Sequence, residues 1–416
     1  MTTTPVFQVG PDDRPAHRDP NVLRWLGAYS ASMAADGVYY IALSWAAVQA
    51  GSPAQAGLVM SVSALPRAVL MLGGGVIADR FGPRRVVIGS DAVRCAAVLA
   101  VAALLFLTGL GLWPLAALAL VFGTVDAVFV PAVGALPARI TGKAQLARVQ
   151  GMRGLAYRCN VIIGAPAGGL AVAFGGAATA FGVAGLLIAV SVPLLISLRV
   201  RELPPADAAA DTTTTAWRDL VAGLHYIRRH DVLAPLMLAI TLGDLGFAGP
   251  LNVGLTLLAD ERGWGASGMG WVLAGFGVGA GSASMTLAVR GRLPRGGWIA
   301  GWSIIAGSIA IAALAYVPSV LAAVGVALLI GLLAGLSGAL CGALLQTHSD
   351  PAYLGRVTAV SSLAGLGLAP LTMPLSAAAI GAWGTGPVFV VSAVVCGLGG
   401  VIALSVRDLR RAELPG

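Results

Sequence analysis

Long apolar stretches alternate with short polar segments along the whole chain. Twelve stretches of roughly twenty or more residues carry almost no charge, at about 22–49, 54–78, 86–109, 112–137, 151–174, 177–199, 232–259, 266–289, 297–316, 319–345, 357–381 and 384–406. A hydrocarbon core about 30 Å thick needs roughly 20 apolar residues per helical span. Because the runs are too long for strands and lack the alternation of a barrel, they predict an all-α integral membrane protein with twelve transmembrane helices.

Composition agrees with a chain that spans lipid. Apolar residues make up 57% of the 416 residues and charged residues only 11%, whereas a soluble domain carries about 25% charged residues. The first two dozen residues are polar and charged, unlike a secretory signal, so we expect the first span to be retained. The four cysteines form no CxxC pair and are interpreted as small buried apolar residues.

The basic residues outside the spans predict the orientation. They lie before the first span or after even-numbered spans, and only Arg262 falls in a loop on the other side. Cytoplasmic loops are enriched in Lys and Arg, so both termini are expected to be cytoplasmic in a cell-membrane protein. The net charge of +8 is therefore interpreted as a topology signal, and no nucleic-acid partner is expected.

The chain also repeats itself. DGVYYIALSWA begins at Asp36 and DLGFAGPLNVG at Asp244, 208 positions later, and the polar segment 199–231 separates six spans from six. Within that segment TTTTAWRDLVAGLHYIRRH predicts either a helix on the inner membrane surface or a solvated linker helix. Two six-helix halves are the layout of a secondary transporter with its site between them. The predicted domains are an N-terminal bundle, a cytoplasmic linker and a C-terminal bundle, over 1–200, 201–230 and 231–416.

One charged segment interrupts the apolar pattern between the second and third spans. GGVIADRFGPRR resembles the signature loop of the major facilitator superfamily, and span count, linker and half-repeat extend the resemblance over the whole chain. The residues that match are Gly75, Asp79, Arg80, Gly82, and Arg84 or Arg85. The resemblance implies the major facilitator fold, with Asp79 contacting the start of the eleventh span and latching the cytoplasmic side. Arg290 stands where the second half would repeat Asp79, so we expect only the first half to gate. A purely topological role would explain the arginines but not Asp79.

A second resemblance lies in the fifth span. NVIIGAPAGGL is similar to the Gly-Pro motif of drug and proton antiporters, through Gly164, Pro166, Gly168 and Gly169. Such helices also occur in membrane bundles without any antiport meaning. SASMAADGVYYIAL and SDAVRCAAV are similar to the enterobactin-exporter and macrolide-efflux branch of the superfamily.

A few charged residues lie deep inside predicted spans, where charge costs several kcal/mol on insertion scales and normally faces a cavity. They are Asp36, Asp126, Asp244, Arg67, Arg94 and Arg158. We expect Asp36 to be the proton site, with Arg67 as the nearest candidate partner; Asp126 ranks second and Asp244 third. The alternative for Asp36 is a structural ion pair with Arg67 or Arg158. Asp91 and Arg94, three apart on one helix, are predicted to form a structural pair.

The inventory of motifs excludes the common enzyme classes. The four histidines lie in polar segments, and the chain contains neither a phosphate-binding GxxxxGK[ST] loop nor a GxSxG turn. An ion gradient remains as the source of energy. The sequence therefore predicts a monomeric, proton-driven exporter of small amphipathic molecules, such as a drug or a siderophore-like metabolite, with no cofactor or metal. The alternatives are an importer or facilitator, and a non-transporting membrane sensor with the same fold.

Overall fold

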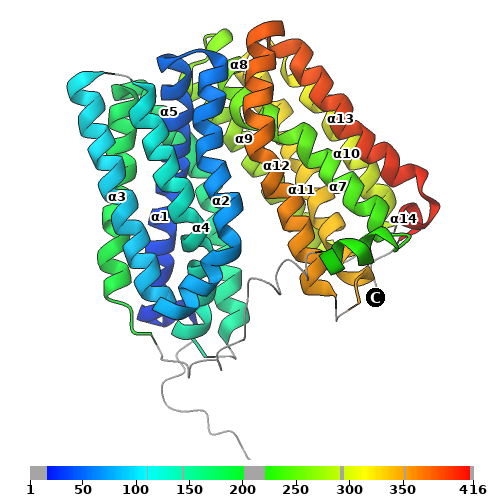
Figure 1. Ribbon diagram of the computed structural model, residues 1–416, viewed down its shortest axis with the longest axis horizontal. Coiled ribbons are helices and arrows are strands. Elements are labelled where there is room, and N and C mark those ends of the chain that lie inside the picture. The colour runs from blue at the N-terminus through cyan, green and yellow to red at the C-terminus, as the bar shows by residue number, and fades with distance from the viewer. Residues whose placement is uncertain are drawn as a thin grey trace, which may run out of the picture.

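The computed structural model of the chain (Figure 1) describes residues 16–109, 111–142, 145–200, 221–290, 295–350 and 353–412. In these ranges every regular element is a helix. The elements are η1 (Ala16–Arg18), α1 (Pro20–Ala50), α2 (Pro53–Phe81), α3 (Pro83–Thr108), α4 (Leu112–Ile140), α5 (Leu146–Ile196), α7 (Leu233–Gly249), η3 (Pro250–Gly254), α8 (Leu255–Glu261), α9 (Gly265–Arg290), α10 (Gly296–Leu314), α11 (Val320–His348), α12 (Leu354–Trp383), α13 (Thr385–Ser405) and α14 (Arg407–Arg411).

The predicted spans coincide with the observed helices. Among the described residues, eight helical stretches are long and apolar enough to cross a membrane by length and composition. One of them, 148–196 in α5, holds both the fifth and the sixth predicted spans. The helices α1, α2 and α9 match the first, second and eighth predictions. The predicted all-α membrane class is confirmed.

Two spans differ from a simple rod. The helix α5 has non-helical backbone angles at Gly175 and Gly176, and the φ of +73° at Gly176 is one that glycine adopts without strain. The seventh span consists of α7, the π-helical η3 and α8 in sequence. Pro250 opens η3; because proline has no N–H, the regular hydrogen-bond ladder cannot continue through it.

Capping residues fix where the first two spans begin. Asp19 accepts a hydrogen bond from the Asn21 N–H at 2.8 Å ahead of α1. Ser52 and Gln55 form a reciprocal capping box ahead of α2. Both caps satisfy backbone N–H groups that a helix leaves without partners at its start.

Figure 1 shows the helices in two groups that stand side by side. In one group α1 and α3 pack against α5, and α2 packs against α4; in the other α9 packs against α11, and α13 against both α7 and α10. Glycine allows close pairing of α9 with α11. A Cβ at Gly279 would lie 2.0 Å from the Leu328 carbonyl oxygen, and one at Gly331 would lie 2.0 Å from that of Phe276. The backbones of α9 and α11 therefore touch.

The two groups meet along α2 with α12 and along α5 with α9. We call the end where α1 finishes and α2 begins the upper end, and the opposite end the lower end. At the upper end the Gln49 side chain donates to Asp260 at 2.7 Å. A Cβ at Gly57 would lie 2.4 Å from the Ala377 Cβ, so α2 and α12 are in close contact there. The groups diverge toward the lower end (Figure 1).

Candidate functional site

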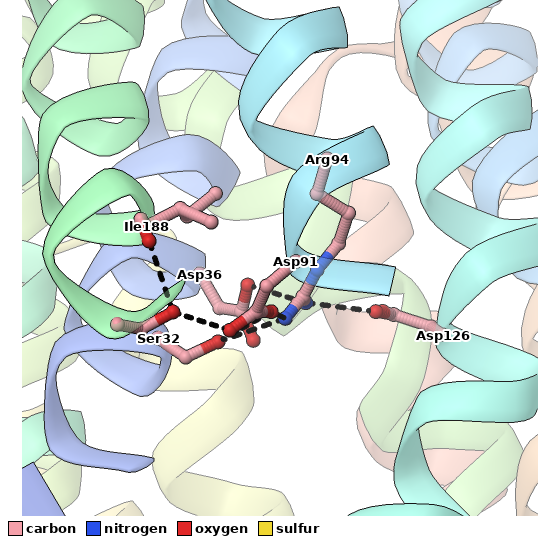
Figure 2. Close-up of polar contacts among 7 residues, drawn as sticks. Ser32, Asp36, Asp91, Arg94, Asp126 and Ile188 are labelled. Atoms are coloured by element: carbon pink, nitrogen blue, oxygen red, sulfur yellow. Dashed lines mark hydrogen bonds and ion pairs between the residues drawn. The ribbon is translucent and has the colours of Figure 1, made fainter. Parts of the chain in front are cut away.

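A single arginine gathers three carboxylates in the first group of helices (Figure 2). Arg94 Nη1 donates to Asp36 Oδ1 at 3.0 Å and to Asp126 Oδ1 at 3.1 Å. Its Nη2 donates to Asp91 Oδ1 at 2.5 Å and to Ser32 Oγ at 2.8 Å. Three helices, α1, α3 and α4, therefore converge on one guanidinium group.

Helix geometry accounts for part of this arrangement. Asp91 and Arg94 are three residues apart on α3, and Ser32 and Asp36 are four apart on α1, so each pair lies on one helix face. Ser32 and Ser191 both donate hydroxyl hydrogen bonds to Asp91, which holds this carboxylate between α1, α3 and α5.

Aromatic rings complete the surroundings of the arginine. The Arg94 guanidinium carbon lies 4.0 Å from the Phe129 ring centroid and 5.7 Å from that of Phe122, distances typical of cation–π contacts. Arg94 itself is fully buried. Its Nε has no hydrogen-bond partner in the part of the chain that the structure describes. The guanidinium is thus surrounded by two aromatic rings, three carboxylates and a serine hydroxyl.

Exposure separates the three acids into two kinds. The Asp91 side chain is 0% exposed, whereas those of Asp36 and Asp126 are 30% and 21% exposed. One guanidinium cannot neutralise three carboxylates, so the cluster carries excess negative charge when all are ionised. Unpaired charge away from water is costly, and a proton on a carboxylate removes it. Asp36 and Asp126 are the acids that water and protons can reach.

Both exposed acids line a cavity of about 610 Å³. It lies between the two groups of helices, because α1, α2, α4, α5, α9 and η3 all contribute to its wall. Across it, the Tyr40 hydroxyl donates to the Asn252 side-chain oxygen at 2.9 Å. The cavity is large enough to hold a small molecule.

The partner predicted for Asp36 is wrong. Arg67 lines the same cavity, but the ion pair of Asp36 is with Arg94. Arg67 Nε is buried without a hydrogen-bond partner among the described residues. Arg158 is exposed and donates to the Ala280 carbonyl at 3.5 Å, so it does not pair with Asp36 either. The predicted pair of Asp91 with Arg94 is confirmed.

Asp244 lies apart from this cluster. It lines a second cavity, of about 310 Å³, enclosed by α7, α9, α10, α11 and α13 of the other group. No arginine or lysine of the described ranges forms an ion pair with it. The structure therefore does not bring Asp244 together with Asp36 and Asp126.

The charged loop between α2 and α3 is a tight turn at Gly82, where φ is +83°. Arg84 reaches the end of α5, and its guanidinium donates to the Leu195 carbonyl at 3.3 Å and to the Ile196 carbonyl at 2.5 Å. Arg80 and Arg85 are exposed. The structure does not describe the side chains of Asp79 and Arg290, and it describes Gly75 only by its backbone. The latch through Asp79 therefore stays a prediction.

The Gly-Pro motif lies where α5 meets both α1 and α9. A Cβ at Gly168 would lie 3.0 Å from the Val38 Cα, and one at Gly169 would lie 2.5 Å from the Ala266 carbonyl oxygen. Gly164 faces Gly37 across the same seam, and backbone angles stay helical through Pro166. The motif permits close contact of three helices that line the cavity; its link to antiport stays a prediction.

A family profile described as Major Facilitator Superfamily matches residues 25–365. The chain belongs to the Major Facilitator Superfamily. It is accordingly a multi-pass membrane protein and a secondary transporter, and not an enzyme.

Solved structures share the superfamily fold at low sequence identity. A mutant of the nucleoside transporter NupG has 11% identity and a TM-score of 0.72, over 93% of this chain and 99% of that one. A POT family transporter in complex with 5-aminolevulinic acid has 13% identity and a TM-score of 0.70, over 93% and 96%. A D-xylose–proton symporter has 12% identity and a TM-score of 0.68, over 93% and 96%. No curated protein sequence matches the chain.

Proposed function

We propose that this transporter exports small amphipathic molecules in exchange for protons, by alternating access of the cavity between the two groups of helices. The predicted domains at 1–200 and 231–416, joined by the linker 201–230, are the bodies that would move against each other. With both termini cytoplasmic, the lower end faces the cytoplasm. The upper contacts near Gln49 and Gly57 would then close the outer side, so the conformation is open to the cell interior.

The observation that supports the proposed proton coupling is that three acids share Arg94. In one conformation Asp36 holds the guanidinium, and this contact favours its ionised form. If α1 moves relative to α3 during transport, Asp36 loses this partner and takes up a proton instead, because an unpaired buried carboxylate is the costlier state. Asp126 shares the same nitrogen of Arg94 and can replace Asp36 as its acceptor. Asp36 remains our preferred proton site and Asp126 the second.

The cavity wall supports an amphipathic substrate. Aromatic and aliphatic side chains such as Tyr40, Phe129 and Leu273 lie beside the acids and Asn160. Such a wall suits a bulky molecule with both apolar and polar parts better than a sugar, which needs many polar contacts. We place the chain by resemblance in the enterobactin-exporter and macrolide-efflux branch. The structures of similar fold include a proton symporter, so import is the outcome to be tested against export.

The test is flux in proteoliposomes with an imposed pH gradient. The purified full chain should move the dye Hoechst 33342 against its concentration gradient only when the compartment that receives the dye is the acidic one. Asp36→Asn should abolish uphill movement while binding persists, since it removes the titrating group and keeps its size. A carrier that works equally well without a pH gradient would be a facilitator. Full uphill transport by Asp36→Asn would move the coupling role to Asp126, and absence of flux at any gradient would favour a sensor.

A further inference from the structure

The second cavity differs in kind from the central one. Its described wall is almost entirely small or apolar, and Asp244 is the one charged residue among the described side chains that line it. Among the described lining residues, the other hydroxyl and thiol groups belong to Ser303, Ser337, Cys341 and Cys396. A carboxylate in such surroundings stands out because the rest of the wall offers it little solvation.

Asp244 also has no cation of its own. Asp36 and Asp126 both hold Arg94, whereas no arginine or lysine of the described ranges pairs with Asp244. An acid within a membrane span is stable when it is protonated or when a cation lies beside it. The described protein supplies no such cation at this position, so one from outside can take that place.

Two phenylalanines line this cavity, and one of them also lines the central cavity. Phe247 on α7 and Phe276 on α9 have ring centroids 5.7 Å apart at an interplanar angle of 46°. Both line the second cavity, and Phe276 lines the central cavity as well. Phe276 therefore belongs to both walls, and the two cavities lie next to each other at this side chain.

We propose that the Asp244 cavity, walled by Phe247 and Phe276, is a subsite for the cationic group of a monovalent organic cation. Aromatic faces attract organic cations, and a carboxylate next to them supplies the opposite charge. Small residues leave room for a methylated or ring-bound nitrogen. A hard inorganic cation is less suitable, because such ions need a shell of several oxygen ligands and the described lining offers one carboxylate. The inference rests on the proposed transport of small amphipathic molecules and narrows them to cations.

Equilibrium binding tests the subsite without any gradient. The probe is tritiated N-methyl-4-phenylpyridinium, a permanent cation that cannot lose its charge, bound to the purified full chain in lipid nanodiscs. Asp244→Asn should weaken its affinity by about tenfold to a hundredfold, the range for a bond to a charged group. The uncharged competitor 4-phenylpyridine, at alkaline pH, should bind the variant and the parent with affinities that differ by less than about twofold.

Two glycine-to-leucine variants test the subsite by changing the space in the cavity without changing any charge. Gly338 lines the cavity, and a Cβ there would meet no atom within 4 Å, so Gly338→Leu fills the space without a backbone clash. Gly325 lies on the same helix, is equally free of neighbours and does not line the cavity. Gly338→Leu should weaken binding of the cation at least as much as Asp244→Asn, and Gly325→Leu should leave it within about twofold.

Three results would overturn the inference. The first is unchanged cation affinity in Asp244→Asn. The second is a greater loss in Asp36→Asn than in Asp244→Asn, which would place the cation at the Arg94 cluster. The third is equal affinity of Gly338→Leu and Gly325→Leu for the cation. This comparison still tests the inference if Asp244→Asn does not fold. Failure of proton-driven flux would leave all these binding measurements unaffected, so the two proposals fail separately.

Discussion

Replacing Arg94 by methionine would take the positive charge away from a buried cluster that holds three carboxylates. Methionine is long and flexible enough to fill most of the space, so the main loss is electrostatic. Arg94 makes ion pairs at 3.0, 2.5 and 3.1 Å while it is fully buried. Removing one partner of a buried pair costs about 3–5 kcal/mol, because the other charge is left uncompensated.

The double variant distinguishes this explanation from a simple loss of packing. Asp91→Asn alone should cost about 1.5–3 kcal/mol, because it weakens a charged, fully buried hydrogen bond. In the Arg94→Met background the same change removes an unpaired charge, so the double variant should be no less stable than Arg94→Met. The two substitutions should therefore couple by about 2 kcal/mol or more.

Thermal unfolding followed by the fluorescence of the nine tryptophans is the assay. At about 1 °C per kcal/mol for a chain of 416 residues, Arg94→Met should lower the Tm by roughly 3–6 °C. Arg85→Met is the matched control, because it removes an exposed arginine of the same helix and should change stability by less than about 0.5 kcal/mol. Strictly additive losses in the double variant would refute the reasoning, since the charges would then not depend on each other.

Two further predictions concern the topology and the signature loop. In a cysteine-free background, Ala209→Cys and Pro318→Cys should react with a membrane-impermeant thiol reagent from opposite sides of the membrane. The reason is that the distribution of basic residues predicts these two loops on different faces of the membrane. Labelling of both cysteines in intact cells would contradict the twelve-span topology. Asp79→Asn should reduce transport at matched expression far more than Arg290→Ala, because a charge-assisted bond worth about 1.5–3 kcal/mol is lost only in the first; equal losses would show that the gate is not asymmetric.

The sequence allowed the spans to be predicted because their signal is local. Each span needs only a run of apolar residues of the right length, and the helices of the structure lie where those runs are. The pair of Asp91 with Arg94 was equally accessible, since a spacing of three residues on one helix fixes their proximity. Even the interruption of the seventh span had a local sign in Pro250.

The contacts between helices could not be predicted in the same way. Arg67 and Arg94 both lie at a depth that would suit Asp36, and only the rotation of α2 and α3 about their own axes decides which of them pairs with it. No spacing in the sequence reports that rotation. Ser191 and Phe129 join the site for the same reason, from α5 and α4, and nothing in their local sequence marks them as neighbours of a buried arginine.

The two halves of the internal repeat surround their matching acids differently. Asp36 and Asp244 open the repeated stretches of the first and seventh spans, yet among the residues that the structure describes only Asp36 pairs with an arginine. That arginine comes from α3. The corresponding helix of the second half is α10, which contains no charged residue and places Ser303 in the wall of the Asp244 cavity. One acid of the matching pair therefore has an arginine partner within the protein, and the other can be balanced by a cation from outside. The first kind suits a proton that comes and goes as Arg94 changes partners, and the second suits a ligand that brings its own positive charge.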